Sequence, residues 1–279
     1  MVFTMNFKRV TALALSATLG AALALALTGC NKPADTGAQA AGSAAPPAAP
    51  TKIVIGLDDS FPPMGFRDEK NELVGFDIDL AREAAKRLGT QVEFKPIDWS
   101  AKEAELNGHR VDALWNGLTI TEERKKNIAF TSPYLENRQI IVVSNESPIK
   151  TKADLAGKVV GAQDGSTAID AIERDAATAK SFKELKKFSD NVTALMDLKI
   201  GRLDAVVVDE VVGRYYLTKK PGEYRVLDEN FGTEQYGVGV RKDDTTLLAE
   251  LQGAFDKMKL DGAATKISEK WFGKDIIVK

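Results

Sequence analysis

The chain has 279 residues, 38 basic and 40 acidic side chains, a net charge of -2 at pH 7, one cysteine and one histidine. Nucleic-acid binding needs clustered Lys and Arg, and this mixed, slightly acidic charge argues against a nucleic-acid partner. With one histidine and one cysteine, His-based triads, Cys–His pairs and the usual zinc sites are nearly impossible, and the sequence has no phosphate-binding P-loop. We therefore expect neither a metal nor a cofactor.

The N-terminus carries an export signal. Lys8 and Arg9 form a short basic region, and residues 10–27 are uncharged and rich in Ala and Leu. A basic start, an apolar run and small residues are typical of a secretory signal peptide, which we predict over residues 1–29. The run ends in LTGC at 27–30, which resembles the bacterial lipobox, the motif whose cysteine is lipidated and becomes the mature N-terminus. The alternative is an uncleaved transmembrane anchor with an incidental cysteine.

Cys30 is the only cysteine, so no disulfide can form within the chain. In a lipobox this cysteine carries a diacylglyceryl group, whose two acyl chains suffice for stable membrane anchoring. Residues 31–50 contain 14 Ala, Pro or Gly and no large apolar side chain, so we expect a flexible, lipidated tether over residues 30–50. The sequence thus predicts an exported protein, lipid-anchored to a membrane and facing the periplasm or the cell exterior.

Strand and helix patterns alternate along the rest of the chain, which is long enough for two lobes. Residues 52–56 predict a strand, and residues 77–88 predict a helix with Ile78, Ala81, Ala85 and Leu88 on one face, ended by Gly89. Such alternation predicts an α/β fold with largely parallel sheets flanked by helices. No second long apolar run follows, which argues against a permease subunit. The later elements of the alternation are residues 92–94, 158–162, 191–200 and 205–209.

A short internal repeat suggests that the two lobes are similar. LNGHRVDA at 106–113 and LKIGRLDA at 198–205 share Leu, Arg, an aliphatic residue, Asp and Ala. Each copy ends a helix, turns and enters an apolar strand, and those strands finish at residues 116–117 and 209–210. Ligands of open α/β sheets bind outside the carboxyl ends of strands, so these polar strand ends are candidate site residues. His109 lies in the first turn, where we expect a solvated side chain.

Four patterns resemble the bacterial extracellular solute-binding proteins of family 3, the polar amino-acid receptors. They are DDSFPPM at 58–64, LVGFDIDLA at 73–81, VDALWNGLTITEER at 111–124 followed by FTSPY at 130–134, and GAQDGST at 161–167 with DE at 209–210. The resemblance covers residues 51–279. It implies a two-lobed periplasmic-binding-protein-like fold of type II, with two crossover strands as a hinge and the ligand in the interlobe cleft.

Alignment to this family gives expected lobe bounds. Lobe 1 would comprise residues 51–137 and 236–279, and lobe 2 residues 138–235. The crossovers would lie near residues 136–139 and 231–236.

Arg124 and Asp209 are the candidate charged ends of the site. An amino acid presents a carboxylate and an ammonium, so its receptor needs a cation and an anion. The planar guanidinium of Arg124 suits a carboxylate, and in the resembling proteins this arginine holds the ligand α-carboxylate. Asp209 ends an apolar strand and corresponds to the acid that accepts the α-ammonium, although it could instead cap a helix. The two residues are expected on different lobes, so only hinge closure lets both touch the ligand.

The other expected contacts surround these two residues. Ser166 and Thr167 lie at an apparent helix start, where free amides favour an anion, and Asp170 is placed for a capping box on Thr167. A plain helix cap is the alternative for this pair. Thr119 and the backbone around Asn116 and Gly117 would complete the lobe 1 side of the site.

The ligand side chain would face Asp58, Phe61 and Gln163. Phe61 precedes two prolines, a stiff turn that could hold its ring over the ligand. Asp58 could bind a guanidinium or ammonium, which favours arginine, lysine or ornithine over glutamine-like or cystine-like ligands. Asp58 could alternatively accept hydrogen bonds from nearby backbone amides as a turn residue. Trp115 departs from the small or aliphatic residues common at its place in the family, and we expect it in the core.

These features predict the monomeric substrate-binding lipoprotein of an ABC importer, which binds a small polar amino acid, has no catalytic residue and docks on the permease subunits. The nearest alternative is an enzyme, because periplasmic cyclohexadienyl dehydratases resemble these receptors and keep the carboxylate-binding arginine. Those enzymes replace part of the ammonium site with a general acid, whereas the acidic pair at 209–210 favours a receptor. A lipoprotein adhesin or signalling receptor is a third possibility.

Overall fold

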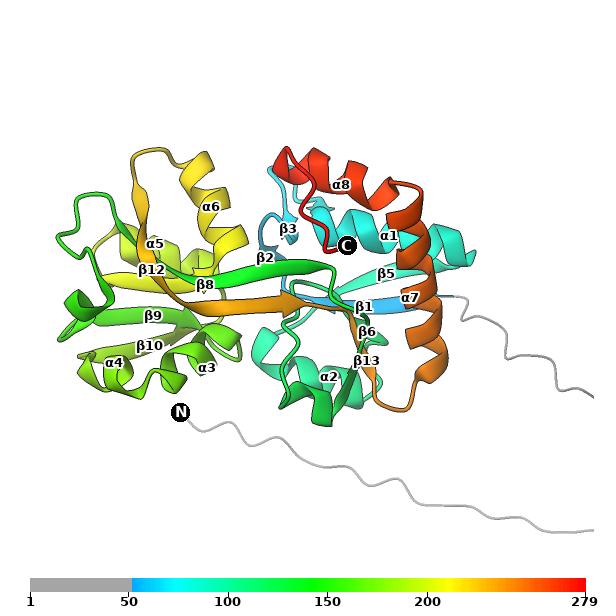
Figure 1. Ribbon diagram of the computed structural model, residues 1–279, viewed down its shortest axis with the longest axis horizontal. Coiled ribbons are helices and arrows are strands. Elements are labelled where there is room, and N and C mark those ends of the chain that lie inside the picture. Colours follow the sequence, from blue (N-terminus) through cyan, green and yellow to red (C-terminus); the bar gives the residue numbers. More distant parts are fainter. Residues whose placement is uncertain (1–51) are drawn as a thin grey trace, which may run out of the picture. The chain divides into compact units, whose positions relative to one another are not determined.

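Two five-stranded sheets and a small three-stranded sheet organise residues 52–279, the part of the chain that a computed structural model describes (Figure 1). The sheets have the orders β5-β1-β6-β13-β7, β10-β9-β11-β8-β12 and β2-β3-β4. The predicted signal peptide, Cys30 and the tether lie outside the described residues. The strands are β1 (Lys52–Leu57), β2 (Ser60–Phe61), β3 (Gly65–Arg67), β4 (Leu73–Val74), β5 (Gln91–Pro96), β6 (Ala113–Leu114), β7 (Ile128–Phe130), β8 (Leu135–Ser144), β9 (Val159–Gln163), β10 (Glu184–Phe188), β11 (Ala205–Asp209), β12 (Tyr224–Tyr236) and β13 (Gly239–Arg241).

Helices pack against each large sheet and so define two α/β lobes. Lobe 1, built on β1, carries α1, α2, α7 and α8, and lobe 2, built on β9, carries α3 to α6 (Figure 1). The predicted α/β, two-lobed fold is thus confirmed. The expectation of largely parallel sheets is wrong, because each large sheet is mixed: β13 pairs antiparallel with β6 and β7, and β8 pairs antiparallel with β11 and β12. Within residues 52–279, no helix is long and apolar enough to cross a membrane. The helices are α1 (Phe76–Leu88), η1 (Trp99–Ala101), α2 (Lys102–Asn107), η2 (Arg124–Lys126), η3 (Lys152–Leu155), α3 (Thr167–Arg174), α4 (Ala176–Ser181), α5 (Asn191–Lys199), α6 (Glu210–Lys219), α7 (Thr245–Leu260) and α8 (Ala263–Phe272).

The two lobes share one local construction at the internal repeat. The amide and the carboxylate of Asp112 both bond Val54 of β1, at 2.7 Å to its carbonyl and 2.9 Å from its amide. Asp204 repeats this arrangement with Val159 of β9, at 2.9 and 2.8 Å. In both lobes the next strand then runs parallel to the strand that the aspartate contacts. The repeated aspartate therefore ties the turn to β1 in lobe 1 and to β9 in lobe 2.

Helix α1 follows the sequence signals closely. Acidic Asp77 and Asp79 lie in its first turn, at the positive end of the helix dipole, where negative charge is favourable. Its inward face buries Ile78 and Ala81, and Gly89 adopts the left-handed conformation that ends the helix. The predicted helix and its glycine stop are both confirmed.

Two long strands connect the lobes. The start of β8 pairs antiparallel with the end of β12, with Leu135 opposite Tyr236 and Asn137 opposite Glu234. Both strands then continue into the lobe 2 sheet, and Figure 1 shows them running side by side from one lobe to the other. A connection made of paired strands lets the lobes rotate without breaking either core.

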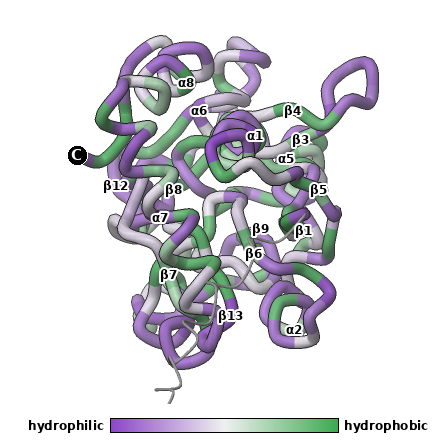
Figure 2. The backbone as a smooth tube through the Cα atoms, turned by 90° about the vertical axis from the view of Figure 1, so that its right-hand side faces the viewer, coloured by the Kyte–Doolittle hydropathy of each residue, from purple (hydrophilic) through white to green (hydrophobic). Residues whose placement is uncertain are grey.

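The cores are apolar, and polar segments lie outside them. In Figure 2 the outlying loop between β3 and β4 is hydrophilic. Trp115 is 1% exposed, and its ring lies 6.4 Å from the ring of Tyr134 and 6.5 Å from that of Phe255. The expectation that Trp115 belongs to the core is confirmed.

Candidate functional site

A small cavity lies where polar strand ends of both lobes meet. Its volume is about 10 Å³, close to that of one water molecule. Lobe 1 contributes the residues after β6 and the start of η2, and lobe 2 contributes the ends of β9 and β11 and the start of α3. All but one of the ten predicted ligand contacts line it. The lining residues are Phe61, Trp99, Asn116, Gly117, Thr119, Arg124, Gln163, Ser166, Thr167 and Asp209.

Arg124 is a buried cation on the lobe 1 side. It is 6% exposed, and its guanidinium donates to the carbonyls of Thr119 at 2.9 Å and Gly165 at 3.2 Å. Burial lowers the pKa of Arg124, while the carboxylates of Asp170, Glu234, Glu103 and Asp209 raise it. Because carbonyl partners carry no charge, the guanidinium keeps its capacity to bind an anion.

Lys102 adds a second cation that the sequence did not single out. It is 4% exposed, and its ammonium donates to the carbonyls of Gly165 at 2.7 Å and Trp99 at 3.1 Å. Burial, and then the charge of Arg124, lower the pKa of Lys102 to about 7. Its place in the first turn of α2, after the Trp99 of η1, gave no local signal, since lysines in that setting are usually solvated.

Direct contacts close the cavity across the lobes. The hydroxyls of Thr119 and Thr167 lie 3.2 Å apart, and Gln163 donates to Asp58 at 2.7 Å. Gly165 has a φ of 69°, and a Cβ there would lie 2.7 Å from the Cα of Ser100 in lobe 1. An amino acid needs far more than 10 Å³, so its entry requires the lobes to move apart and replace these contacts.

Asp58 lies behind Gln163 and does not line the cavity. One carboxylate oxygen accepts the Ser60 amide at 2.8 Å, which is the turn bond weighed as an alternative from the sequence. The other oxygen accepts the Gln163 amide, and the Gln163 nitrogen also donates to the carbonyl of Ser189 at 3.0 Å. Burial raises the pKa of Asp58 to about 6. Asp58 therefore reaches the site through Gln163.

Asp209 supplies the negative charge of lobe 2. It is 5% exposed, and its Oδ1 accepts from Tyr236 at 2.5 Å, Asn137 at 2.7 Å and Gln139 at 3.0 Å. Asp209 occupies the N-cap position of α6, but its side chain makes no capping hydrogen bond. The helix-cap alternative is thus wrong for this carboxylate, and among residues 52–279 its Oδ2 has no hydrogen-bond donor.

The start of α3 differs from the sequence expectation. The N-cap is Ser166, whose hydroxyl donates to the carbonyl of Gln163 at 2.8 Å instead of capping the helix. Thr167 is already helical and donates to Glu234 at 2.7 Å, so the predicted capping box with Asp170 is wrong. Because neither side chain caps the helix, the amides at the start of α3 keep their capacity to bind an anion.

Phe61 and Gly117 form the remaining wall. Gly117 has a φ of 60°, and a Cβ there would lie 2.8 Å from the Phe61 ring, so only glycine fits. The Gly117 amide donates to Asp77 at 2.8 Å, and Tyr134 donates to the same oxygen at 2.8 Å. Burial raises the pKa of Asp77 to about 7. Asp77 thus fixes the loop that carries Asn116 to Thr119.

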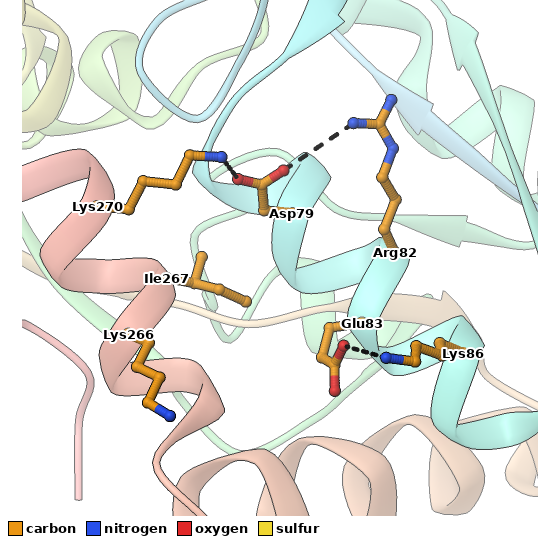
Figure 3. Close-up of a pocket in the computed structure, with 7 residues that line it drawn as sticks. All are labelled: Asp79, Arg82, Glu83, Lys86, Lys266, Ile267 and Lys270. Carbon is orange, nitrogen blue, oxygen red and sulfur yellow. Dashed lines mark hydrogen bonds and ion pairs between the residues drawn. The ribbon is translucent and has the colours of Figure 1, made fainter.

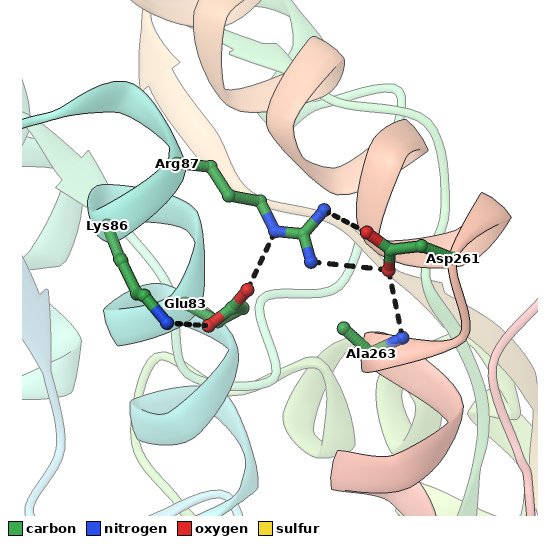
Figure 4. Close-up of polar contacts among 5 residues, drawn as sticks. All are labelled: Glu83, Lys86, Arg87, Asp261 and Ala263. Atoms are coloured by element: carbon green, nitrogen blue, oxygen red, sulfur yellow. Dashed lines mark hydrogen bonds and ion pairs between the residues drawn. The ribbon is translucent and has the colours of Figure 1, made fainter.

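A larger hollow of about 420 Å³ lies between α1 and α8, and most of its charged side chains are paired with one another (Figure 3). Asp79 bonds Lys270 at 2.6 Å and lies 4.0 Å from Arg82. Next to it, Arg87 joins Glu83 at 2.8 Å to Asp261 at 2.6 Å (Figure 4). These ion pairs link α1 to the C-terminal helices, which is a structural role. Within residues 52–279, no group of three or more metal-ligating side chains could hold a metal ion.

This two-lobed fold, with buried charges of opposite sign at one interlobe cavity, defines a class of ligand-binding proteins, and comparison with known proteins gives the family. The model of the bacterial extracellular solute-binding proteins, family 3, matches residues 53–274. The chain belongs to this family. Family membership places the protein among extracellular or periplasmic solute-binding proteins.

Similar proteins are binding proteins and not enzymes. The chain is 32% identical over 226 residues to the L-cystine-binding protein TcyJ of Escherichia coli (strain K12), covering 80% of this chain and 84% of that protein. A substrate-binding protein of an ABC uptake transporter from Streptococcus pneumoniae with bound histidine has a TM-score of 0.79 and 39% identity, covering 82% of this chain and 95% of that one. An ancestral arginine-binding protein bound to arginine has a TM-score of 0.75 and 43% identity, covering 80% and 99%.

Proposed function

We propose that this protein binds the zwitterionic part of an L-amino acid between its lobes and delivers it to the permease of an ABC importer. One observation carries the proposal: Arg124 of lobe 1 and Asp209 of lobe 2, buried and opposite in charge, line the same cavity. A carboxylate on Arg124 and an ammonium on Asp209 can both be satisfied only when the lobes are together. The closed form is then the state that the permease reads, and a dissociation constant of about 1 μM would suffice.

The proposed contacts follow the geometry of the site. The carboxylate would take the Arg124 guanidinium, the Thr119 hydroxyl and the amides at the start of α3, near Ser166 and Thr167. The ammonium would take the free Oδ2 of Asp209. The side chain would pass between Phe61 and the wall formed by Asn116, Gly117 and Gln163, with Asp58 fixing Gln163 from behind.

The test is a thermal-shift screen of the mature protein against the twenty amino acids, ornithine and cystine, followed by calorimetry of the hits. Ligands that bind the native state raise its apparent stability, so we expect a shift with one or a few polar amino acids. Cationic amino acids are the first to test, because relatives are bound to arginine and histidine. No shift with any amino acid, combined with turnover of prephenate, would support the dehydratase alternative instead.

The lobe bounds are part of the proposal. We place lobe 1 at 51–137 and 236–279 and lobe 2 at 138–235, so that the rotation occurs where β8 and β12 pair. This placement is supported by the course of β8 and β12. The two strands pair with each other at residues 135–137 and 234–236, where the lobe bounds fall, and both belong to the lobe 2 sheet.

Export and anchoring form the last part of the proposal. We infer that residues 1–29 are removed and that Cys30 carries the lipid, with residues 30–50 as a tether to a monomeric receptor. Cys30→Ser should move the protein from the membrane fraction to the soluble fraction and leave ligand affinity unchanged. Retention of this variant in membranes would instead indicate an uncleaved anchor.

A further inference from the structure

A second carboxylate, that of Glu234 on β12, lies beside Asp209. The side-chain amide of Asn137 donates to Asp209 at 2.7 Å and to Glu234 at 2.8 Å. The amide of Gln139 also donates to both, at 3.0 Å and 2.9 Å. Two nitrogens thus bridge the same pair of oxygens, which holds the two carboxylates close together on the crossover strands.

Within residues 52–279, no cation donates a hydrogen bond to either carboxylate of the pair. Its direct partners are neutral: the amides of Asn137 and Gln139, the Tyr236 hydroxyl on Asp209 and the Thr167 hydroxyl on Glu234 at 2.7 Å. Burial, followed by the charge of Glu234, raises the pKa of Asp209 well above its usual range. Two carboxylates that close repel each other when both are ionised, so an added cation would stabilise the ionised pair.

The charged groups around the pair do not supply that cation. Arg124, whose charge interacts with both carboxylates, donates its hydrogen bonds to carbonyls. Arg138, between Asn137 and Gln139 on β8, is paired with Glu210 at 2.7 and 2.5 Å. The titratable and charged groups that interact with the pair include Arg124 of η2 and Tyr236 of β12.

We propose that Glu234 is the second carboxylate of the ammonium site and that binding of the ligand ammonium releases the proton which Glu234 and Asp209 otherwise share. The inference rests on the proposed function. The ammonium approaches the free Oδ2 of Asp209, which is 5% exposed and lines the cavity. Its charge allows both carboxylates to ionise, and the displaced proton passes to solvent. Glu234 therefore sets the specificity of this end of the site for a cationic amine over a neutral group.

The release is measurable by calorimetry in two buffers of different ionisation enthalpy at pH 7. Lys102, with a pKa of about 7, could take up a proton near the ligand carboxylate, so the readout is the difference between variants. Glu234→Gln should shift the proton count by about one toward uptake, because a neutral amide cannot hold the shared proton. It should also weaken amino-acid binding about tenfold.

Asp228→Asn is the matched control, because Asp228 is an exposed carboxylate on the same strand. It should release as many protons as the wild type. If Glu234→Gln fails to fold, Glu234→Asp retains a carboxylate and should keep the release. Equal proton counts for wild type and Glu234→Gln would overturn the inference while leaving amino-acid binding intact. A wild type that binds no amino acid would instead defeat the proposed function.

Discussion

The proposed carboxylate end of the site holds two buried cations, and the proposed ammonium end holds two carboxylates. At the carboxylate end, Arg124 and Lys102 both donate to the single carbonyl of Gly165 in the other lobe. At the ammonium end, Asp209 and Glu234 share two amide donors. Each end gathers two like charges whose direct hydrogen-bond partners are neutral groups.

The difference lies in how each end can relieve its repulsion. Arg124 is always charged, so among these two cations only Lys102 can lose its proton, and burial beside Arg124 lowers the pKa of Lys102 to about 7. At the other end both members are carboxylates, and the relief that we propose is a shared proton. The zwitterion of an amino acid compensates both ends at once, so the geometry favours ligands that carry both charges.

The largest predicted effect comes from breaking the carboxylate end. Arg124→Ala should abolish measurable binding, because the ligand carboxylate would remain buried without its partner. Such truncations cost about 2–5 kcal/mol, or about 30-fold to several thousand-fold in affinity. Calorimetric titration with the best ligand of the screen measures the loss.

The neighbouring Lys125→Ala is the control, because Lys125 is exposed and pairs with Glu122 at 2.7 Å. It should bind as the wild type does. Circular dichroism must show that Arg124→Ala is folded. A folded Arg124→Ala with unchanged affinity would remove Arg124 from the site.

The sequence predicted the two ends unequally. Arg124, Thr119 and Gly117 sit in one continuous motif, and the resemblance of that motif to the family assigned them to the site together. The ammonium end joins Asn137, Asp209 and Glu234, which are far apart in the chain and meet only because β8 and β12 pair. Glu234 gave no signal of its own in that strand.

Fold prediction followed the same rule. Helix α1 and the repeated turns at Asp112 and Asp204 are local features, so residues close together in the sequence are enough to predict them. Side-chain partners across the cleft are not local: Thr167 was read as a cap for its own helix, yet its hydroxyl bonds Glu234 on another strand. A capping residue and a cleft residue have the same sequence signature, and only packing decides between them.

An intermediate effect is expected from Lys102→Met. Removing the second cation should weaken ligand affinity by about 1 kcal/mol, or about fivefold, because Lys102 acts on the carboxylate through space.

The same substitution should also change how the free energy of unfolding depends on pH. The pKa of Lys102 is about 7 in the folded protein against an ordinary 10.5, so the unfolded chain binds more protons between these values. Wild-type stability therefore gains from this group as pH rises from 7 to 10.5, and the cost of its buried charge is fully present below 7.

Denaturant unfolding at pH 6.5 and pH 9 measures this linkage without ligand. Lys102→Met should be more stable relative to wild type at the lower pH, and that advantage should shrink at the higher pH. Lys126→Met, at an exposed lysine paired with Glu123, should show no such dependence. A pH-independent difference for Lys102→Met would show that folding does not lower the pKa of Lys102.

The smallest effect on ligand affinity is expected from Asp58→Asn, because Asp58 belongs to neither charged end of the site. Asp58 touches Ser60 and Gln163, and its bond to Gln163 joins the two lobes at 2.7 Å. Asparagine keeps the acceptor for Ser60 but loses the charge that holds Gln163, so closure should weaken by about 0.5 kcal/mol for every ligand. Competition binding with arginine, lysine and glutamine should then give equal losses of about twofold in affinity. A selective loss of arginine and lysine would contradict this result and show that Asp58 also meets the ligand side chain, as a receptor for cationic amino acids would require.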